Sequence, residues 1–316
     1  MEAPQQGNQT SITEFILQGF GTLPELQILL FLLFLVIYIA TMAGNILIMV
    51  LVVTDQHLHT PMYFFLGNLS CLETCYTSTV LPRMLASLLS GDRTISFSGC
   101  ITQYYFFCSM LSTECLLLSV MSYDRYLAIV KPLHYTARMS GRSCLHLTVD
   151  SWVGGFLASS IATVSISQLN FCGPNSIDHF FCDFIPLVKL SCNDPQLMEI
   201  LAFILCFIFS LVPFLLTVIS YIRIITTILR IPSTTGRQKA FSTCSSHLIV
   251  VSIYYGTLLL VYMFPTAHML GDFKKVLSIV YTVLTPLVNP LIYTLRNKEV
   301  KGALRKACRK FMLGQW

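Results

Sequence analysis

Charged residues are scarce in this sequence. Asp, Glu, Lys and Arg make up 11% of the 316 residues, whereas hydrophobic residues make up 54%. A soluble globular domain carries roughly 25% charged residues. The composition therefore excludes an ordinary soluble protein and indicates a protein that resides in a lipid bilayer.

Several functional signatures are also missing. The sequence has no His-Glu-x-x-His, no Gly-x-Ser-x-Gly and no phosphate-binding glycine loop, which disfavours a membrane enzyme. No repeat relates its two halves, which disfavours a transporter built from internal repeats around a midplane site. The first 25 residues have neither a basic start nor an apolar core, so we expect no cleavable signal peptide and expect the first span to direct insertion.

Long hydrophobic runs, in contrast, are abundant. A helix needs about 20 apolar residues to cross the hydrocarbon core. Seven stretches meet this length: Leu26–Val53, Met62–Leu89, Ile101–Ile129, Ser143–Ile166, Gln196–Leu229, Lys239–Phe264 and Phe273–Leu295. They predict an all-α membrane protein with a seven-transmembrane-helix bundle over residues 26–295, an extracellular tail over residues 1–25 and a cytoplasmic segment over residues 296–316.

The orientation of the bundle follows from its basic residues. With the N-terminus outside, 5 Lys and Arg residues lie outside and 15 lie inside, which together are the 20 of the sequence. Cytoplasmic loops carry such an excess, so we predict a multi-pass plasma-membrane protein with an extracellular N-terminus. The net charge of +5 is explained by this topology and requires no nucleic-acid partner. Asn8-Gln9-Thr10 is then a glycosylation sequon in the external tail.

Carboxylic acids nevertheless occur deep within the hydrophobic stretches, at Glu73, Glu114 and Asp150. An ionisable side chain in the hydrocarbon region must be neutralised, paired or hydrated internally. Two interpretations of Glu73 and Glu114 remain open, a protonated hydrogen-bonded pair and a cation site. A catalytic pair is disfavoured because no nucleophile or metal motif accompanies them, and Asp150 receives no role.

Four of the 12 cysteines lie on the external side of the predicted spans: Cys100, Cys172, Cys182 and Cys192. Oxidising conditions outside the cell favour two disulfides, but the residues alone do not choose among the three pairings. The loop that holds three of these cysteines is long, and such loops are commonly functional lids. His179, Cys182 and Asp183 also suggest a metal site, which is disfavoured because a disulfide-bonded Cys182 cannot act as a thiolate ligand.

Five motifs occur in order along the chain. They are LHTPMYFFL at residues 58–66, SYDRYLAIVKPLHY at 122–135, KAFSTCSSHL at 239–248, YYGT at 254–257 and PLVNPLIY at 286–293. Together they closely resemble the odorant receptors of the tetrapod-type class, a branch of the rhodopsin-like G-protein-coupled receptors. Two positions depart from the usual pattern, Val130 in place of cysteine and Glu73 in place of the more common aspartate.

The resemblance implies a signalling function and assigns roles to specific residues. The receptor would bind a volatile odorant, activate a stimulatory, olfactory-type G protein and raise cyclic AMP, in the cilia of olfactory sensory neurons. The implied switch and G-protein-coupling residues are Asp124, Arg125, Tyr126, Tyr221, Asn289, Pro290 and Tyr293. The implied disulfides are Cys100–Cys182 and Cys172–Cys192, and a sodium ion is implied near Glu73 and Glu114.

The resemblance also implies a ligand pocket on four helices. Its positions are Phe107, Cys108, Leu111, Ser112, Cys115, Leu205, Cys206, Phe209, Tyr255, Leu258, Leu259, Tyr262, Ile279 and Thr282. The third-helix members share one helical face, although plain helix packing gives the same stripe. Because no member is charged, amines and strongly acidic ligands are disfavoured. We expect a small, mainly hydrophobic volatile with one hydrogen-bonding group, which Ser112, Tyr262 or Thr282 would contact.

The segment after the seventh span is basic and amphipathic. Val300, Leu304, Cys308 and Phe311 are about one turn apart, so we expect a helix that lies along the inner leaflet and contacts membrane lipid. Cys308 is a candidate for palmitoylation, and an unmodified cysteine is equally consistent with the pattern.

Overall fold

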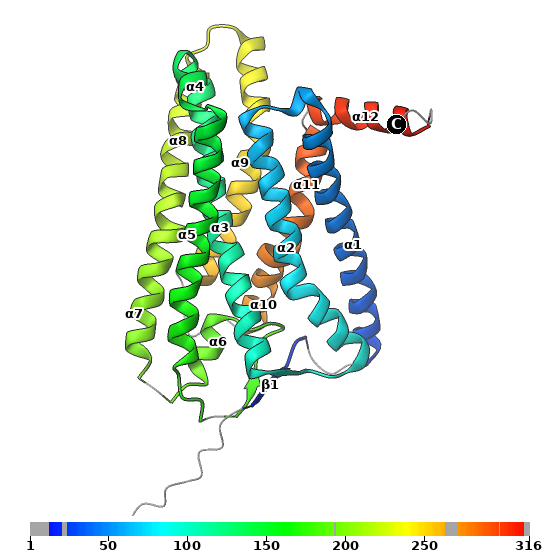
Figure 1. Cartoon of the computed structure of the whole chain (residues 1–316), viewed down its shortest axis with the longest axis vertical. Coiled ribbons are helices and arrows are strands. Elements are labelled where there is room, and N and C mark those ends of the chain that lie inside the picture. The colour runs from blue at the N-terminus through cyan, green and yellow to red at the C-terminus, as the bar shows by residue number, and fades with distance from the viewer. Residues whose placement is uncertain are drawn as a thin grey trace, which may run out of the picture.

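The protein is a bundle of long helices that run side by side (Figure 1). The computed structural model describes residues 13–20, 24–172, 174–192, 194–262, 271–296 and 298–312. The first four long helices are α1 (Pro24–Thr54), α2 (Pro61–Ser90), α3 (Phe97–Val130) and α5 (Gly141–Ser167). The remaining three rods are α7–η2–α8 (Pro195–Cys206, Phe207–Leu211, Val212–Leu229), α9 (Thr234–Tyr262) and α10–η3–α11 (Gly271–Ile279, Val280–Leu284, Thr285–Arg296). Each of the seven predicted spans corresponds to one of these rods.

Within the described residues, six rods are long and apolar enough to cross a membrane. The helix that does not meet this criterion is α2, which carries Glu73 and several Ser and Thr residues. It is as long as the others and packs between α1 and α3 (Figure 1). Its polar residues therefore reflect a position inside the bundle, and α2 completes a seven-helix architecture.

Local sequence signals set the helix boundaries. Pro61 opens α2, where its missing N–H has no intrahelical partner to lose. The hydroxyl of Ser96 accepts a hydrogen bond from the Gly99 N–H and caps α3. Helix α2 ends at Gly91, whose φ of 74° lies in the left-handed region that glycine adopts readily. These caps give α2 and α3 defined ends at the same end of the bundle.

A small sheet covers the end of the bundle at the bottom of Figure 1. It consists of β1 (Glu14–Leu17), β2 (Thr94–Ser96) and β3 (Ser176–Ile177) in the order β2-β1-β3. Strand β1 is antiparallel to β2 and parallel to β3. Part of the predicted extracellular tail over residues 1–25 is therefore ordered as a strand, because Phe15 and Leu17 bury their side chains there. We call this end of the bundle the sheet end. Asn8 lies outside the described residues.

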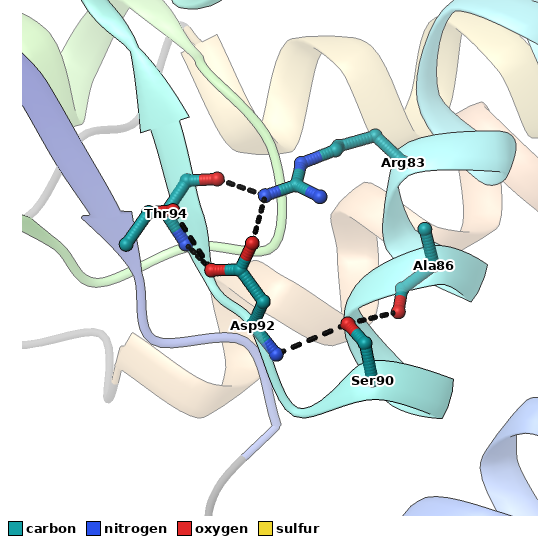
Figure 2. A network of polar contacts seen from close by, with 5 residues as sticks. All are labelled: Arg83, Ala86, Ser90, Asp92 and Thr94. Atoms are coloured by element: carbon teal, nitrogen blue, oxygen red, sulfur yellow. Dashed lines mark hydrogen bonds and ion pairs between the residues drawn. The ribbon is translucent and has the colours of Figure 1, made fainter.

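The turn between α2 and β2 is fixed by polar contacts (Figure 2). Arg83 of α2 donates to the Thr94 carbonyl and lies 3.8 Å from a carboxylate oxygen of Asp92. The backbone N–H and hydroxyl of Thr94 donate to Asp92, at 2.9 and 2.8 Å. These hydrogen bonds favour the carboxylate and lower the pKa of Asp92. The turn thereby holds β2 in place for pairing with β1.

Both expected disulfide pairings occur at the sheet end, Cys100–Cys182 and Cys172–Cys192. The first joins α3 to the long connection between α5 and α7, which also contains the short helix α6 (Phe184–Lys189). Gln103 of α3 accepts a hydrogen bond of 3.0 Å from the Cys182 N–H and donates one to the Thr79 carbonyl of α2. The connection is thus attached to the bundle immediately before Asp183.

The opposite end carries the turn η1 (Gln56–Leu58) and two helices, α4 (Pro132–Arg138) and α12 (Lys298–Met312). Helix α12 lies across the bundle direction in Figure 1. The Tyr63 hydroxyl donates to Glu299 at 2.7 Å, and Lys306 lies 3.6 Å from Asp55. Val300 is buried, as its place in the amphipathic pattern predicts. The side chains of Cys308 and Phe311 lie outside the described part of the chain. We call this end the α12 end.

Helix α5 presents two different faces. On its inner face, Gly155 allows close contact with α3, because a Cβ there would lie 2.8 Å from the Ser109 carbonyl oxygen. On its outer face, Asp150 is exposed, and nothing in the structure explains an acid at that position.

Candidate functional site

A cavity of about 810 Å³, including its open mouth, lies toward the sheet end of the bundle. Its walls come from α3, α5, α6, α7, η2 and α9. Nine of the predicted ligand positions line it: Cys108, Leu111, Ser112, Cys115, Leu205, Cys206, Phe209, Leu258 and Tyr262. The third-helix stripe and the fifth-helix set therefore face the same space.

The η2 segment shapes one wall of this cavity. It is a π-helical turn that ends just before Pro213, and it contributes Phe209 and Ser210 to the lining. Such turns occur frequently at functional sites. Helices α3 and α5 form other walls of the cavity, and a hydrogen bond of 2.6 Å from the Ser159 hydroxyl of α5 to the Tyr105 carbonyl of α3 joins them.

Five predicted positions do not line this cavity, and two of them are aromatic. Phe107 is fully buried between Tyr76 and Phe181, with ring centroids 5.4 and 4.6 Å away. The Tyr255 hydroxyl donates to the Cys115 carbonyl at 2.6 Å, so its side chain links α9 to α3. Both aromatic residues therefore belong to the packed core of the bundle.

The other three are Leu259, Ile279 and Thr282. The Thr282 hydroxyl donates to the Ser278 carbonyl of its own helix at 2.6 Å. Ile279 packs against the buried cluster that contains Tyr281. Leu259 is half-buried and outside the lining. Of the three candidates for a polar ligand contact, Ser112 and Tyr262 reach the cavity and Thr282 does not.

The cavity contains an acid that sequence reasoning did not place there. Asp183 lines it and is only 4% exposed, so the cavity contains an acid that the predicted set of ligand positions does not include. Its Oδ1 accepts two hydrogen bonds, from the Phe184 N–H at 2.8 Å and from the Tyr262 hydroxyl at 2.9 Å. Burial raises the pKa of Asp183 to about 6, although both hydrogen bonds act in the opposite direction. The adjacent disulfide cysteine was the available signal, because Cys182 fixes residue 183 beside α3.

Polar contacts continue from Asp183 toward the seventh rod. The Tyr262 and Tyr281 hydroxyls lie 3.3 Å apart, and Tyr281 donates to the Ser278 hydroxyl at 3.2 Å. The Ser278 hydroxyl also lies 3.3 Å from Nε2 of His179 in the α5–α7 connection. Burial, with a smaller effect of Lys275, lowers the pKa of His179 to about 3. The connection, α9 and α10–η3 are therefore joined through one chain of polar groups.

At the α12 end, Asp124 and Arg125 form a buried ion pair with an N–O distance of 2.7 Å. The Tyr135 hydroxyl of α4 donates to the other Asp124 oxygen at 2.9 Å. Both carboxylate oxygens of Asp124 are thus bound, one by Arg125 and one by α4. The arginine is held within α3 by its neighbour and makes no ion pair with another helix among the described residues.

Two further predicted switch residues lie near this ion pair. The Tyr221 hydroxyl of α8 lies 2.6 Å from Nδ1 of His247 in α9. Tyr126 packs against the apolar cluster that contains Tyr221 and Cys244. Helices α3, α8 and α9 therefore meet around Tyr221 in this state.

The third group of switch residues lies on α11. Asn289 donates to a carboxylate oxygen of Glu73 on α2. Tyr293 is fully buried, and its hydroxyl has no hydrogen-bond partner among the described residues. Pro290 packs against Gly44 of α1, where an added Cβ would lie 3.2 Å from the proline ring.

Glu73 and Glu114 differ in their contacts. Glu73 is bound to Asn289, whereas neither carboxylate oxygen of Glu114 has a hydrogen-bond partner within the described residues. The nearby Tyr254 hydroxyl donates instead to the Leu111 carbonyl at 2.9 Å. The two acids are therefore not hydrogen-bonded to each other, and Glu114 is a buried group with unused acceptors.

Comparison with known proteins agrees with this arrangement. The family model described as olfactory receptor matches residues 34–310. Olfactory receptor 10A7 of Homo sapiens is 51% identical over 306 residues, which cover 97% of each chain. Olfactory receptor 11A1 of Homo sapiens is 49% identical, with 97% of this chain and 96% of the relative covered. Olfactory receptor 5AP2 of Mus musculus is 48% identical, with 98% of both covered. The chain therefore belongs to the olfactory receptor family, and it is a multi-pass plasma-membrane receptor that couples an odorant to a G protein.

Proposed function

We propose that this receptor binds a small, mainly hydrophobic volatile in the cavity between α3, α5, η2 and α9. The observation that carries the proposal is the lining, in which nine positions expected to contact an odorant surround one space. Most of its side chains are apolar, with a few polar groups among them, as in small-molecule sites. The cavity lies toward the sheet end, which we assign to the extracellular side. We also propose that the receptor resides in olfactory cilia.

We propose that the signal passes to the α12 end through α9. This helix contributes Tyr262 to the cavity, binds α3 through Tyr254 and Tyr255, and binds α8 through His247. A ligand can favour an arrangement of α9 only by its differential affinity for the two states. Outward movement of the inner end of α9 would break the Tyr221–His247 contact and give a G protein access to Arg125.

The G protein is proposed to be the stimulatory, olfactory type, so activation would raise cyclic AMP. Expression of the receptor with a cyclic AMP reporter, screened against chemically diverse volatiles, tests this proposal. We expect agonist responses that Arg125→Ala abolishes at equal surface expression. Arg142→Ala, an exposed arginine near the same end, is the control and should keep the response. A response that survives in Arg125→Ala, or that reports through another second messenger, would contradict the proposed coupling.

A sodium ion is proposed as a second ligand, between Glu73 and Glu114. The unused oxygens of Glu114, together with the side-chain carbonyl oxygens of Asn45 and Asn289, are buried acceptors without donors in the described structure. A cation would bind such oxygens, and a protonated carboxyl group would instead donate its O–H to one of the neighbouring amide oxygens. The alternative is therefore a protonated state of both acids.

A further inference from the structure

We propose that Asp183 determines ligand class, because its second carboxylate oxygen accepts a hydrogen bond from the odorant. The cavity would thus select volatiles that carry an O–H or N–H donor over ethers, esters and hydrocarbons of the same shape. This inference rests on the proposed function, in which the odorant occupies this cavity. It replaces the expectation of a pocket without an acid.

The first argument is the uneven use of the two carboxylate oxygens. Both protein donors, the Phe184 N–H and the Tyr262 hydroxyl, bind Oδ1. Among the residues that the structure describes, none donates to Oδ2. A carboxylate has acceptor capacity on both oxygens, so Oδ2 keeps capacity that no described protein donor uses. Since Asp183 lines the cavity, an O–H or N–H group of the ligand could donate a hydrogen bond to Oδ2.

The second argument is the absence of a compensating cation in the described surroundings. The other titratable side chains that line the cavity are Tyr104, Cys108, Cys115, Cys206 and Tyr262, none of them basic. Of the basic side chains in the connection and α10, Lys275 is paired with Asp178 at 2.5 Å and His179 contacts Ser278. The exposed Lys189 and the half-buried Lys274 form no ion pair with Asp183 among the described residues. A hydroxyl would therefore be stabilised by Asp183, and an ammonium group more strongly.

The third argument is that three other hydroxyls of the lining, those of Tyr262, Ser159 and Ser165, already donate to protein acceptors. The Tyr262 hydrogen is already donated to Asp183, so an ether or ester oxygen must compete for it with a carboxylate. The Ser159 and Ser165 hydroxyls donate to backbone carbonyls at 2.6 and 2.9 Å. Beside Asp183, a donor-bearing ligand therefore meets a vacant acceptor, whereas an acceptor-only ligand meets a tyrosine hydroxyl that is already engaged. The lining hydroxyls of Ser112 and Ser210, on α3 and η2, remain for ligand acceptors elsewhere in the cavity.

The test uses matched probes on the full-length receptor with a cyclic AMP reporter. Linear, cyclic and aromatic alcohols are each assayed beside their methyl ether and the primary amine of the same skeleton. We expect the alcohol or amine to be more potent than the ether by about tenfold or more, as for a hydrogen bond to an ionised group.

Asp183→Asn is the decisive variant, because the amide keeps an oxygen for Phe184 and Tyr262 and presents an N–H₂ group in place of Oδ2. We expect it to abolish the amine preference and to shift potency toward the ethers. Asp178→Asn in the same connection, whose carboxylate pairs with Lys275 outside the cavity, is the control and should leave the ranking unchanged. Surface expression is measured for every variant. If Asp183→Asn does not reach the surface, Asp183→Glu is assayed in its place with the same probes.

The outcomes separate the two proposals. Equal potency of alcohols and ethers, or a ranking that Asp183→Asn leaves unchanged, overturns the role of Asp183. Either result is compatible with the proposed function, in which the receptor responds to an odorant. Silence of the wild-type receptor toward every volatile, with full surface expression and a reporter that responds to direct cyclase activation, contradicts the proposed function itself.

Discussion

The side-chain amide of Asn45 in α1 donates a hydrogen bond of 3.1 Å to the backbone carbonyl of Pro286 in the seventh rod. This carbonyl lies four residues before Pro290, which has no N–H to donate to it. The interhelical contact therefore satisfies the backbone group that the proline leaves unpaired. It also joins the first helix to the segment that contains Asn289 and Tyr293.

Replacement of Asn45 by alanine should destabilise the receptor, because the Pro286 carbonyl would be left buried without a donor. We expect a loss of about 1–3 kcal/mol, measured as a lower thermal unfolding midpoint in detergent. Thr54→Ala on the same helix removes a hydroxyl that donates to the Val50 carbonyl of the same helix and should have a much smaller effect. Equal midpoints for Asn45→Ala and the wild type would show that this contact is unimportant for stability.

Loss of the Tyr135 hydroxyl should raise basal signalling. In Tyr135→Phe, one oxygen of Asp124 loses its donor from α4, so the attachment of α4 to the ion pair is weakened by about 1–3 kcal/mol. The measurement is cyclic AMP without agonist, normalised to surface receptor. Tyr123→Phe, whose hydroxyl has the exposed Arg138 at 3.4 Å as its partner within the described residues, is the matched control. Basal activity that stays at the wild-type level in Tyr135→Phe would argue against this restraint.

Asp183 should make receptor stability depend on pH. Its pKa in the folded protein, about 6, is above the usual 3.8, so the folded state binds the proton more readily. The resulting stabilisation is complete below pH 3.8 and disappears as the pH rises through about 6. We expect about 1 kcal/mol of added stability on acidification from about pH 7.5 to about pH 5.

Thermal unfolding of the wild type and Asp183→Asn at both pH values measures this difference. His179 titrates in the opposite sense, because its lowered pKa disfavours protonation in the folded state, but it is present in both proteins and cancels. Identical pH dependence of the two proteins would mean that Asp183 titrates as an ordinary exposed acid.

Sodium should stabilise the wild-type receptor if Glu73 and Glu114 hold the ion. Exchange of sodium for the larger N-methylglucamine ion at constant ionic strength should lower the unfolding midpoint of the wild type and leave Glu114→Gln unaffected. The physical reason is that the glutamine removes the charge while it keeps the size of the side chain. No dependence on sodium in the wild type would favour the protonated state of both acids.

Much of this architecture could be predicted from the sequence because it depends on local composition. Hydrophobic length identified the seven rods, and the motif that contains Asp124 and Arg125 identified a pair that is indeed buried at one end. The strand at Phe15 was missed because a four-residue strand has little local signal and depends on pairing with two distant segments.

The cavity was predicted less completely because its lining depends on tertiary geometry. Asp183 lies in the lining because the Cys100–Cys182 disulfide fixes its neighbour Cys182 beside α3. Sequence periodicity does not reveal this placement. Thr282 lies within the π-helical segment η3, where the wider turn changes which side chains face inward relative to a regular α-helix. Phe107 shares the helical face of the true lining residues but is covered by Phe181 of the connection.

The most direct test of the account is to fill the cavity. Ala162 on α5 lines it, and Val164 on the same helix is 56% exposed on the outer face. Agonist dose–response curves should be measured for Ala162→Phe and Val164→Phe at equal surface expression, with direct cyclase activation as a control. The account predicts that Ala162→Phe loses the agonist response and that Val164→Phe keeps it. An unchanged response in Ala162→Phe would contradict the claim that the odorant acts from this cavity.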